Sequence, residues 1–232
     1  LCRGRRGNAY ILASESCALS SVGAEFIRDI EPGEIISITR DGISSNRSLV
    51  QSQRAHCIFE YIYFARLDSQ MDGINIYDAR IRAGNALATA YPADAVIKPT
   101  QKERESSVKI KLNVLKSVVS GKRIVLVDDS IVRGTTIANL ITMLRRAGAV
   151  SVHVRISSPP FLYPCYFGTD VPSDKQLIAS SHTTEEICSM IGADSLGYLK
   201  ISALDHMVGG MPICRACFDG KYPMDCEQKA GR

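Results

Sequence analysis

Two adjacent aspartates, Asp128 and Asp129, stand at the point in this 232-residue sequence where chemistry is most strongly indicated. They follow the short apolar run Ile124–Val127, which predicts a strand buried on both faces, as in a parallel sheet. Open α/β sheets bind ligands at the carboxyl ends of such strands. We therefore expect Asp128 and Asp129 to contact a ligand or a metal ion; the alternative is a surface turn with two solvated carboxylates.

A short loop and a helix follow the acidic pair. The helix is predicted by apolar residues at helical spacing, namely Ile137, Leu140, Ile141 and Leu144. Gly148 ends it, and Gly134 permits a tight turn before it. Thr135 and Thr136 then place hydroxyls and backbone N–H groups at the helix N-terminus, which suits an anion. Neither the Walker A pattern nor a dinucleotide-binding fingerprint is present. A ligand with a phosphate at one end and vicinal hydroxyls or a metal-bound diphosphate at the other would fit.

The run Val127–Thr136, VDDSIVRGTT, resembles the phosphoribosyl pyrophosphate (PRPP) loop of type I phosphoribosyltransferases, in the form found in glutamine PRPP amidotransferases. The resemblance implies an α/β fold with a parallel sheet flanked by helices. It implies a glycosyltransferase that converts PRPP, glutamine and water to 5-phosphoribosylamine, glutamate and pyrophosphate, the first step of de novo purine biosynthesis. By the same resemblance Asp128 and Asp129 are catalytic and contact Mg²⁺. The implied PRPP-binding residues are Asp128, Asp129, Ser130, Arg133, Gly134, Thr135 and Thr136.

The eight cysteines are the second feature of the sequence that could take part in chemistry. In a reducing compartment they are expected to be ligands or thiols rather than disulfides. Cys214 and Cys217 form a C-x-x-C pair. From spacing alone, this pair with other, unrelated thiols is as plausible as a metal site. If there is a metal site, four thiolates would suit either Zn²⁺ or a [4Fe–4S] cluster. The segments that begin at Cys57 and Cys214 are similar to the same family. That similarity implies a [4Fe–4S] cluster, structural or oxygen-sensing, held by Cys57, Cys165, Cys214 and Cys217.

Residues 1–50 are predicted to be rich in β-structure. Ala9–Ala13 and Glu34–Ile38 are candidate strands, whereas Val22–Ile30 is expected to be a short helix or irregular. ASESCAL and GAEFIRDIEPGE in this stretch resemble the last part of the amidotransferase glutaminase domain, an αββα N-terminal-nucleophile fold. The resemblance implies that most of that domain, with its nucleophile, is absent from this sequence. We therefore expect Cys2 to be an ordinary thiol.

The sequence is shorter than the family pattern between Val96 and Lys98, where the pyrophosphate-binding loop and the closing loop are missing. Either residues of the protein are left out of this sequence, or the protein carries a deletion. We favour the first explanation, because removing a core strand and helix would open the sheet. The expected domains are 1–50, the end of the glutaminase domain; 51–206, the phosphoribosyltransferase domain with a gap near 96–98; and 207–232, a cysteine-bearing tail.

Other elements must surround the acidic loop. A helix is predicted over Tyr77–Thr89, with Ile81, Leu87 and Ala88 toward a core. The remaining predictions are strands at Val108–Leu112, Ser151–Ile156 and Gly192–Leu199, a capping box at Thr183–Glu186, and a structural role for His153.

Composition restricts the partners. The net charge is only +4, and no basic run suggests nucleic acid or a membrane surface. No signal peptide and no membrane-spanning stretch is visible, so we expect a cytoplasmic protein. The resemblance implies PRPP and glutamine as substrates, purine nucleotides as feedback inhibitors, and a homotetramer or homodimer.

Two other functions stay open at this point. A non-catalytic PRPP-sensing regulator would need a DNA-binding module, and neither a basic helix nor a helix-turn-helix is evident. A nucleobase phosphoribosyltransferase would not need the cysteine set or the glutaminase-like stretch. A test of ammonia against nucleobases as acceptor separates it from the amidotransferase.

Overall fold

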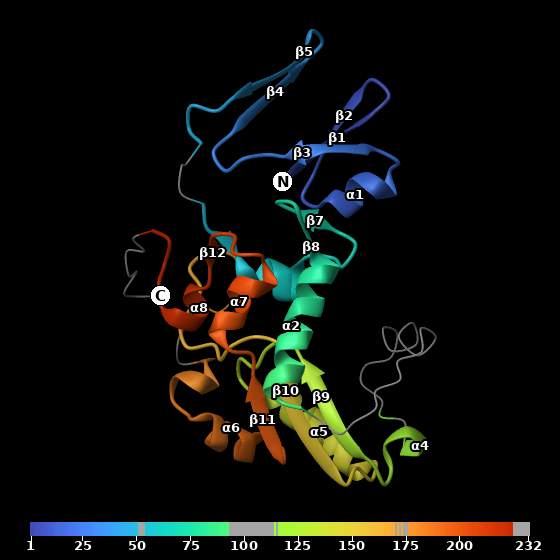
Figure 1. The fold of residues 1–232 in the computed structure, drawn as a ribbon, viewed down its shortest axis with the longest axis vertical. Coiled ribbons are helices and arrows are strands. Elements are labelled where there is room, and N and C mark those ends of the chain that lie inside the picture. Colours follow the sequence, from blue (N-terminus) through green and yellow to red (C-terminus); the bar gives the residue numbers. More distant parts are fainter. Residues whose placement is uncertain are drawn as a thin grey trace. The chain divides into compact units, whose positions relative to one another are not determined.

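The computed structural model describes residues 1–50, 54–92, 114, 116–169, 171, 173 and 176–224 (Figure 1). The chain forms two compact units, one of Leu1–Arg82 with Leu204–Cys214 and one of Ala83–Ala203 with Arg215–Arg232. The division falls inside helix α2 (Ile76–Ala90) and inside helix α7 (Ile201–Met207). The domain ranges expected from the family resemblance were not defined by compactness, so the two units do not test them and they stay a prediction. The expected strand at 108–112 and the gap near 96–98 lie outside the described residues.

The first unit is built mainly from antiparallel pairs. Strand β1 pairs with β2 and β3, β4 pairs with β5, and β7 pairs with β8, whereas β12 and β6 run parallel. Besides its parts of α2 and α7, the elements are β1 (Cys2–Arg6), β2 (Ala9–Ala13), α1 (Ser16–Ser21), β3 (Glu25–Asp29), β4 (Ile35–Thr39), β5 (Gly42–Asn46), β6 (His56–Cys57), the π-helix Glu60–Phe64, β7 (Gln70–Met71), β8 (Ile74–Asn75) and β12 (Ile213–Cys214).

Both strands predicted in residues 1–50 are confirmed, as β2 and β4. The expectation of a helix or irregular structure over Val22–Ile30 is wrong, because β3 occupies its centre. This strand forms by pairing along β1, from Cys2 opposite Asp29 to Arg5 opposite Glu25. Such pairing depends on a distant segment, which a local pattern does not reveal.

The carboxylate of Glu34 ties three strands of this unit together. Glu34 Oε2 accepts hydrogen bonds from Arg28 Nη1 of β3 at 2.8 Å and from the Glu31 backbone N–H at 2.9 Å. The hydroxyl of Ser45, on β5, also donates to this carboxylate, which directly precedes β4. Hydrogen bonds from Arg28, then from Ser45, hold the pKa of Glu34 well below its usual range.

Replacing Glu34 with glutamine should therefore lower the melting temperature at neutral pH, and the deficit should shrink in acid. A carboxyl with a depressed folded-state pKa stabilises the protein above its unfolded pKa, here about 4.5, and that contribution is lost as pH falls toward the folded value. Circular dichroism melts at a series of pH values would measure the difference. Glu25→Gln, on the exposed surface of β3, is the matched control. A deficit that does not change with pH would contradict this role for Glu34.

The second unit contains a parallel sheet in the order β11-β10-β9. Helices α5 and α6 contact each other, and they pack on β10 and β11 respectively (Figure 1). Besides its parts of α2 and α7, the elements are α4 (Lys116–Val119), β9 (Arg123–Asp128), α5 (Thr135–Arg146), β10 (Ser151–Ile156), the 3-10 turn η3 (Ile178–Ser180), α6 (Thr184–Ile191), β11 (Ser195–Tyr198) and α8 (Ala216–Asp219).

The apolar pattern of this unit is largely confirmed. Buried side chains of α5 and of the sheet form one core with those of α6, and the core includes Ile137, Ile141, Leu144, Val152, Val154, Ile156, Ile187 and Ile191. Strands β10 and β11 lie where they were predicted, and Thr183 and Glu186 form the predicted capping box. His153 hydrogen-bonds through both ring nitrogens to the hydroxyls of Ser195 and Ser151, in keeping with a structural role.

Two burial predictions are wrong. Val127 is 55% exposed, because Ile124 and Leu126 alternate toward the core and Val127 faces the other side of β9. In α2, Ile81 is 47% exposed and Ala88 is also exposed. Leu87 is buried as predicted, and the buried face of that helix also carries Ile76, Ala79 and Ala83.

Candidate functional site

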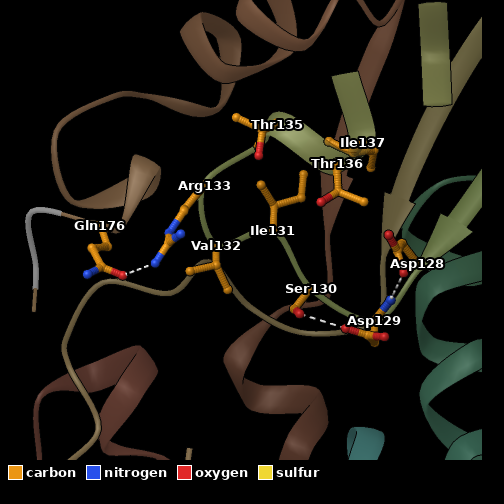
Figure 2. A pocket seen from close by; sticks show the side chains of 11 residues that line it. Asp128, Asp129, Ser130, Ile131, Val132, Arg133, Thr135, Thr136, Ile137 and Gln176 are labelled. Carbon is orange, nitrogen blue, oxygen red and sulfur yellow. Dashed lines mark hydrogen bonds between the residues drawn. The ribbon is translucent and has the colours of Figure 1, made fainter. Parts of the chain in front are cut away.

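The acidic pair and the loop after it line a pocket of about 410 Å³ in the second unit. Its wall is continuous in sequence from Asp128 to Ile137, and Gln176 completes it from a different segment (Figure 2). Figure 2 shows the two aspartates on one side of the loop, and Arg133 with Gln176 on the other. The predicted PRPP-binding residues therefore all line one pocket.

Strand pairing fixes the acidic end of this pocket. Asp128 is the last residue of β9 and stands opposite Ile156, the last residue of β10. Its carbonyl accepts a hydrogen bond of 2.9 Å from the Ser157 backbone N–H. Asp128 thus lies at the carboxyl edge of the sheet, as predicted.

Local hydrogen bonds turn the chain sharply after Asp128. The Asp129 backbone N–H donates to Asp128 Oδ1 at 2.9 Å, and the Ser130 hydroxyl donates to Asp129 Oδ1 at 2.6 Å. Burial raises the pKa of Asp128, and the neighbouring charge of Asp129 adds to the rise, although the Asp129 N–H opposes it. Two close carboxylates, one of them partly desolvated, favour a cation or a set of hydroxyl donors between them.

The other end of the pocket is the N-terminus of α5. Gly134 is the N-cap residue, and no side chain caps the helix there. The first-turn N–H groups, which have no intrahelical acceptor, carry the positive end of the helix dipole. Arg133 adds a full positive charge on the same side of the pocket. This end suits a phosphate, so the pocket combines an anion site with a carboxylate pair.

Gly134→Ala should damage the phosphate end in particular. Gly134 has φ 80°, and a Cβ there would lie 3.2 Å from Ile178 Cδ1 and 3.5 Å from Ile191 Cγ2. A side chain in this left-handed conformation costs about 1–2 kcal/mol. We expect phosphate affinity, measured by calorimetry, to fall about tenfold. Gly84→Ala in α2 meets no atom within 4 Å and serves as control. Unchanged phosphate affinity in Gly134→Ala would contradict this role for the loop.

The four cysteines predicted to hold a cluster are divided between the two units. In the first unit, Cys57 of β6 and Cys214 of β12 are register partners on neighbouring parallel strands, so their side chains share a face. In the second unit, Cys165 Sγ accepts backbone N–H groups from Phe167 and Thr169, both at 3.4 Å. The Cys217 carbonyl accepts N–H groups from Leu162 and Tyr163, shortly before Cys165.

Within the described part of the chain, no group of three or more histidine, cysteine, aspartate and glutamate side chains is placed to hold a metal ion. The four-cysteine site stays a prediction from the sequence.

Cys2 is poorly placed for nucleophilic chemistry. Its side chain is 1% exposed, and its thiol donates to the Ala13 carbonyl at 3.4 Å. Burial raises the pKa of the Cys2 thiol, which lowers the population of the reactive thiolate. These features agree with the expectation of an ordinary thiol.

Gln176 is the pocket residue that sequence reasoning missed. It hydrogen-bonds Arg133 from a segment more than 40 residues further along the chain. No motif marks the position, so only the folded chain reveals its place.

Among the described residues, no helix is both long and apolar enough to span a membrane.

The chain is similar to curated proteins in sequence and to solved structures in fold. No family model matches the sequence. Curated relatives named amidophosphoribosyltransferase include those of Bacillus subtilis, 42% identical over 97% of this chain and 56% of the relative, and Methanocaldococcus jannaschii, 41% identical over 97% and 59%. That of Archaeoglobus fulgidus is 43% identical over 97% and 58%. The chain thus spans a little under three-fifths of these relatives.

The alignment with the Bacillus subtilis relative covers 269 positions, more than the 232 residues of this chain. The relative therefore contains residues that have no counterpart here.

Solved structures agree with the sequence relatives. The glutamine PRPP amidotransferase of Bacillus subtilis, complexed with ADP and GMP, has a TM-score of 0.84 and 40% identity, over 98% of this chain and 60% of its own. A structure described as the allosteric regulatory enzyme of purine biosynthesis has a TM-score of 0.85 and 40% identity, over 98% and 58%. The predicted α/β fold is confirmed. Over almost its whole length, the chain is therefore similar to part of the proteins named amidophosphoribosyltransferase.

Proposed function

We propose that the protein catalyses the amidophosphoribosyltransferase reaction, in which PRPP, glutamine and water give 5-phosphoribosylamine, glutamate and pyrophosphate. One observation supports it most strongly. A single pocket at the carboxyl end of β9 has two carboxylates on one side and an uncapped helix N-terminus with Arg133 on the other. PRPP carries a phosphate at one end of its ribose and a diphosphate with vicinal hydroxyls at the other, which matches this distribution.

Each part of the pocket has a role in this proposal. The N–H groups and hydroxyls of Thr135 and Thr136, with Arg133, bind the 5-phosphate. The Asp128 and Asp129 carboxylates accept hydrogen bonds from the ribose hydroxyls. During reaction the bond from C1 to pyrophosphate breaks and a bond from ammonia nitrogen forms. Positive charge develops on the ribose ring, as in glycoside chemistry, and the nearby carboxylates stabilise it.

Mg²⁺ fits the acidic end of the pocket by its donor chemistry. Two carboxylates, Asp128 and Asp129, offer the oxygen ligands that this cation prefers. When bound, Mg²⁺ would neutralise charge on the departing pyrophosphate. Glutamine supplies the ammonia, and we assign none of the described residues to its hydrolysis.

The proposal includes a [4Fe–4S] cluster held by Cys57, Cys165, Cys214 and Cys217. Support comes from the register of Cys57 with Cys214 and from the two N–H groups donated to Cys165 Sγ, since hydrogen bonds to the sulfurs are a usual part of iron–sulfur sites. The Cys214-x-x-Cys217 spacing also suits a thiolate-bound centre. Because the reaction transfers no electrons, the role of the cluster is structural or oxygen-sensing.

Regulation is proposed from one of the solved structures. The Bacillus subtilis structure is complexed with ADP and GMP. We therefore propose purine nucleotides as inhibitors of this protein. A homodimeric or homotetrameric assembly and a cytoplasmic location are proposed from the sequence alone.

An acceptor assay tests the function. Pyrophosphate release from PRPP would be measured with glutamine, with ammonia and with a panel of nucleobases. We expect release with glutamine or ammonia and none with a base. Release that depends on a base would replace the proposal with a nucleobase phosphoribosyltransferase. PRPP binding with no release under any condition would instead favour a PRPP-sensing regulator.

A further inference from the structure

Gln176, in the segment that leads to η3, lines the side of the pocket opposite the aspartates (Figure 2). We propose that Gln176 is a positioning residue, which holds the Arg133 guanidinium ready for the phosphate of the ligand. The proposal deepens the function above and rests on the same site.

Contacts from this segment reach three consecutive residues of the loop. Gln176 Oε1 accepts a hydrogen bond from Arg133 Nη2. The Ile178 backbone N–H donates to the Val132 carbonyl at 2.9 Å. The Ile178 side chain packs against Gly134, where a Cβ would come within 3.2 Å of it. The segment therefore supports the backbone of the loop and also restrains its one cationic side chain.

The chemistry of Gln176 suits this task. Arginine loses about 2 kcal/mol of rotamer entropy when fixed, and a partner that fixes it before binding reduces the cost borne by the ligand. Within the described part of the chain, an uncharged amide is the side-chain hydrogen-bond partner of Arg133. An amide restrains the guanidinium without cancelling its charge, so the charge stays available to an anion.

Affinity for inorganic phosphate, for ribose 5-phosphate and for PRPP would be measured by calorimetry on the full protein. Gln176→Met keeps the length of the side chain but removes the strong acceptor, and we expect all three affinities to fall about tenfold. Gln176→Glu restores an acceptor oxygen but pairs the Arg133 charge with a carboxylate, so all three affinities should stay low. In turnover the Gln176→Met defect should appear in KM for PRPP and leave kcat largely unchanged. Ser181→Ala, an exposed neighbour whose hydroxyl contacts His182, is the control.

A double-mutant cycle separates positioning from general support of the loop. In an Arg133→Ala background, Gln176→Met should cause no further loss, because the group that it positions is gone. An equal loss with and without Arg133 would overturn the inference, as would unchanged affinity in Gln176→Met alone.

The choice of ligands keeps the two proposals distinguishable. Coupled losses of phosphate affinity in a protein that does not bind PRPP would support the role of Gln176 and refute the proposed function. PRPP binding that is unchanged in the Gln176 variants would refute the role of Gln176 and support the proposed function. A native protein that binds none of the three ligands would refute both.

Discussion

Asp128→Asn and Asp129→Asn are each expected to lower PRPP-dependent turnover by about a hundredfold or more. Asparagine keeps the size of the side chain but removes the charge that would bind Mg²⁺ and stabilise the cationic ribose. Losing one preorganised electrostatic group of this kind costs about 10²–10³ in rate. Steady-state pyrophosphate release with ammonia as acceptor would measure the loss, because this assay does not depend on glutamine hydrolysis.

Folding must be excluded as the cause of such a loss. Because burial raises the pKa of Asp128, its charged form is disfavoured in the fold, and Asp128→Asn should melt no lower than the native protein. Asp78→Asn, at an exposed position in the first turn of α2, is the matched control. Normal turnover in both pocket variants would refute the assignment of this loop.

Serine at any of the four proposed cluster ligands should abolish stable iron binding. Anaerobically prepared protein is expected to hold about four iron atoms per chain, with a broad visible absorption. Each of Cys57→Ser, Cys165→Ser, Cys214→Ser and Cys217→Ser should lose both the iron and the colour. Iron and sulfide analysis would measure the loss.

Cys188→Ser is the control for the cluster ligands. The Cys188 thiol donates to the Ala193 carbonyl at 3.3 Å, a contact that serine can replace, and iron should remain in this variant. Zinc in place of iron, or full iron content in the four ligand variants, would contradict the cluster.

The site was predictable where its determinants are local. The run from Ile124 to Gly148 contains its own strand, turn and helix signals, and the structure forms β9, the acidic turn and α5 in that order. The resemblance of VDDSIVRGTT to the PRPP loop then predicted PRPP as the ligand of the pocket.

Features that depend on distant parts of the chain were missed. Strand β3 exists by pairing with β1, and Gln176 reaches Arg133 from a segment without a motif. The exposure of Val127 and Ile81 depends on which side of β9 or α2 is covered by neighbours. Apolar residue type alone does not specify that side.

Calorimetry of PRPP binding, with and without Mg²⁺, tests the central claim most directly. The account predicts that PRPP binds the native protein, that Mg²⁺ strengthens binding, and that Asp129→Asn removes the Mg²⁺ effect but still binds inorganic phosphate. Failure of the folded native protein to bind PRPP would contradict the account. PRPP binding that is indifferent to both Mg²⁺ and Asp129 would contradict the assigned role of the acidic pair.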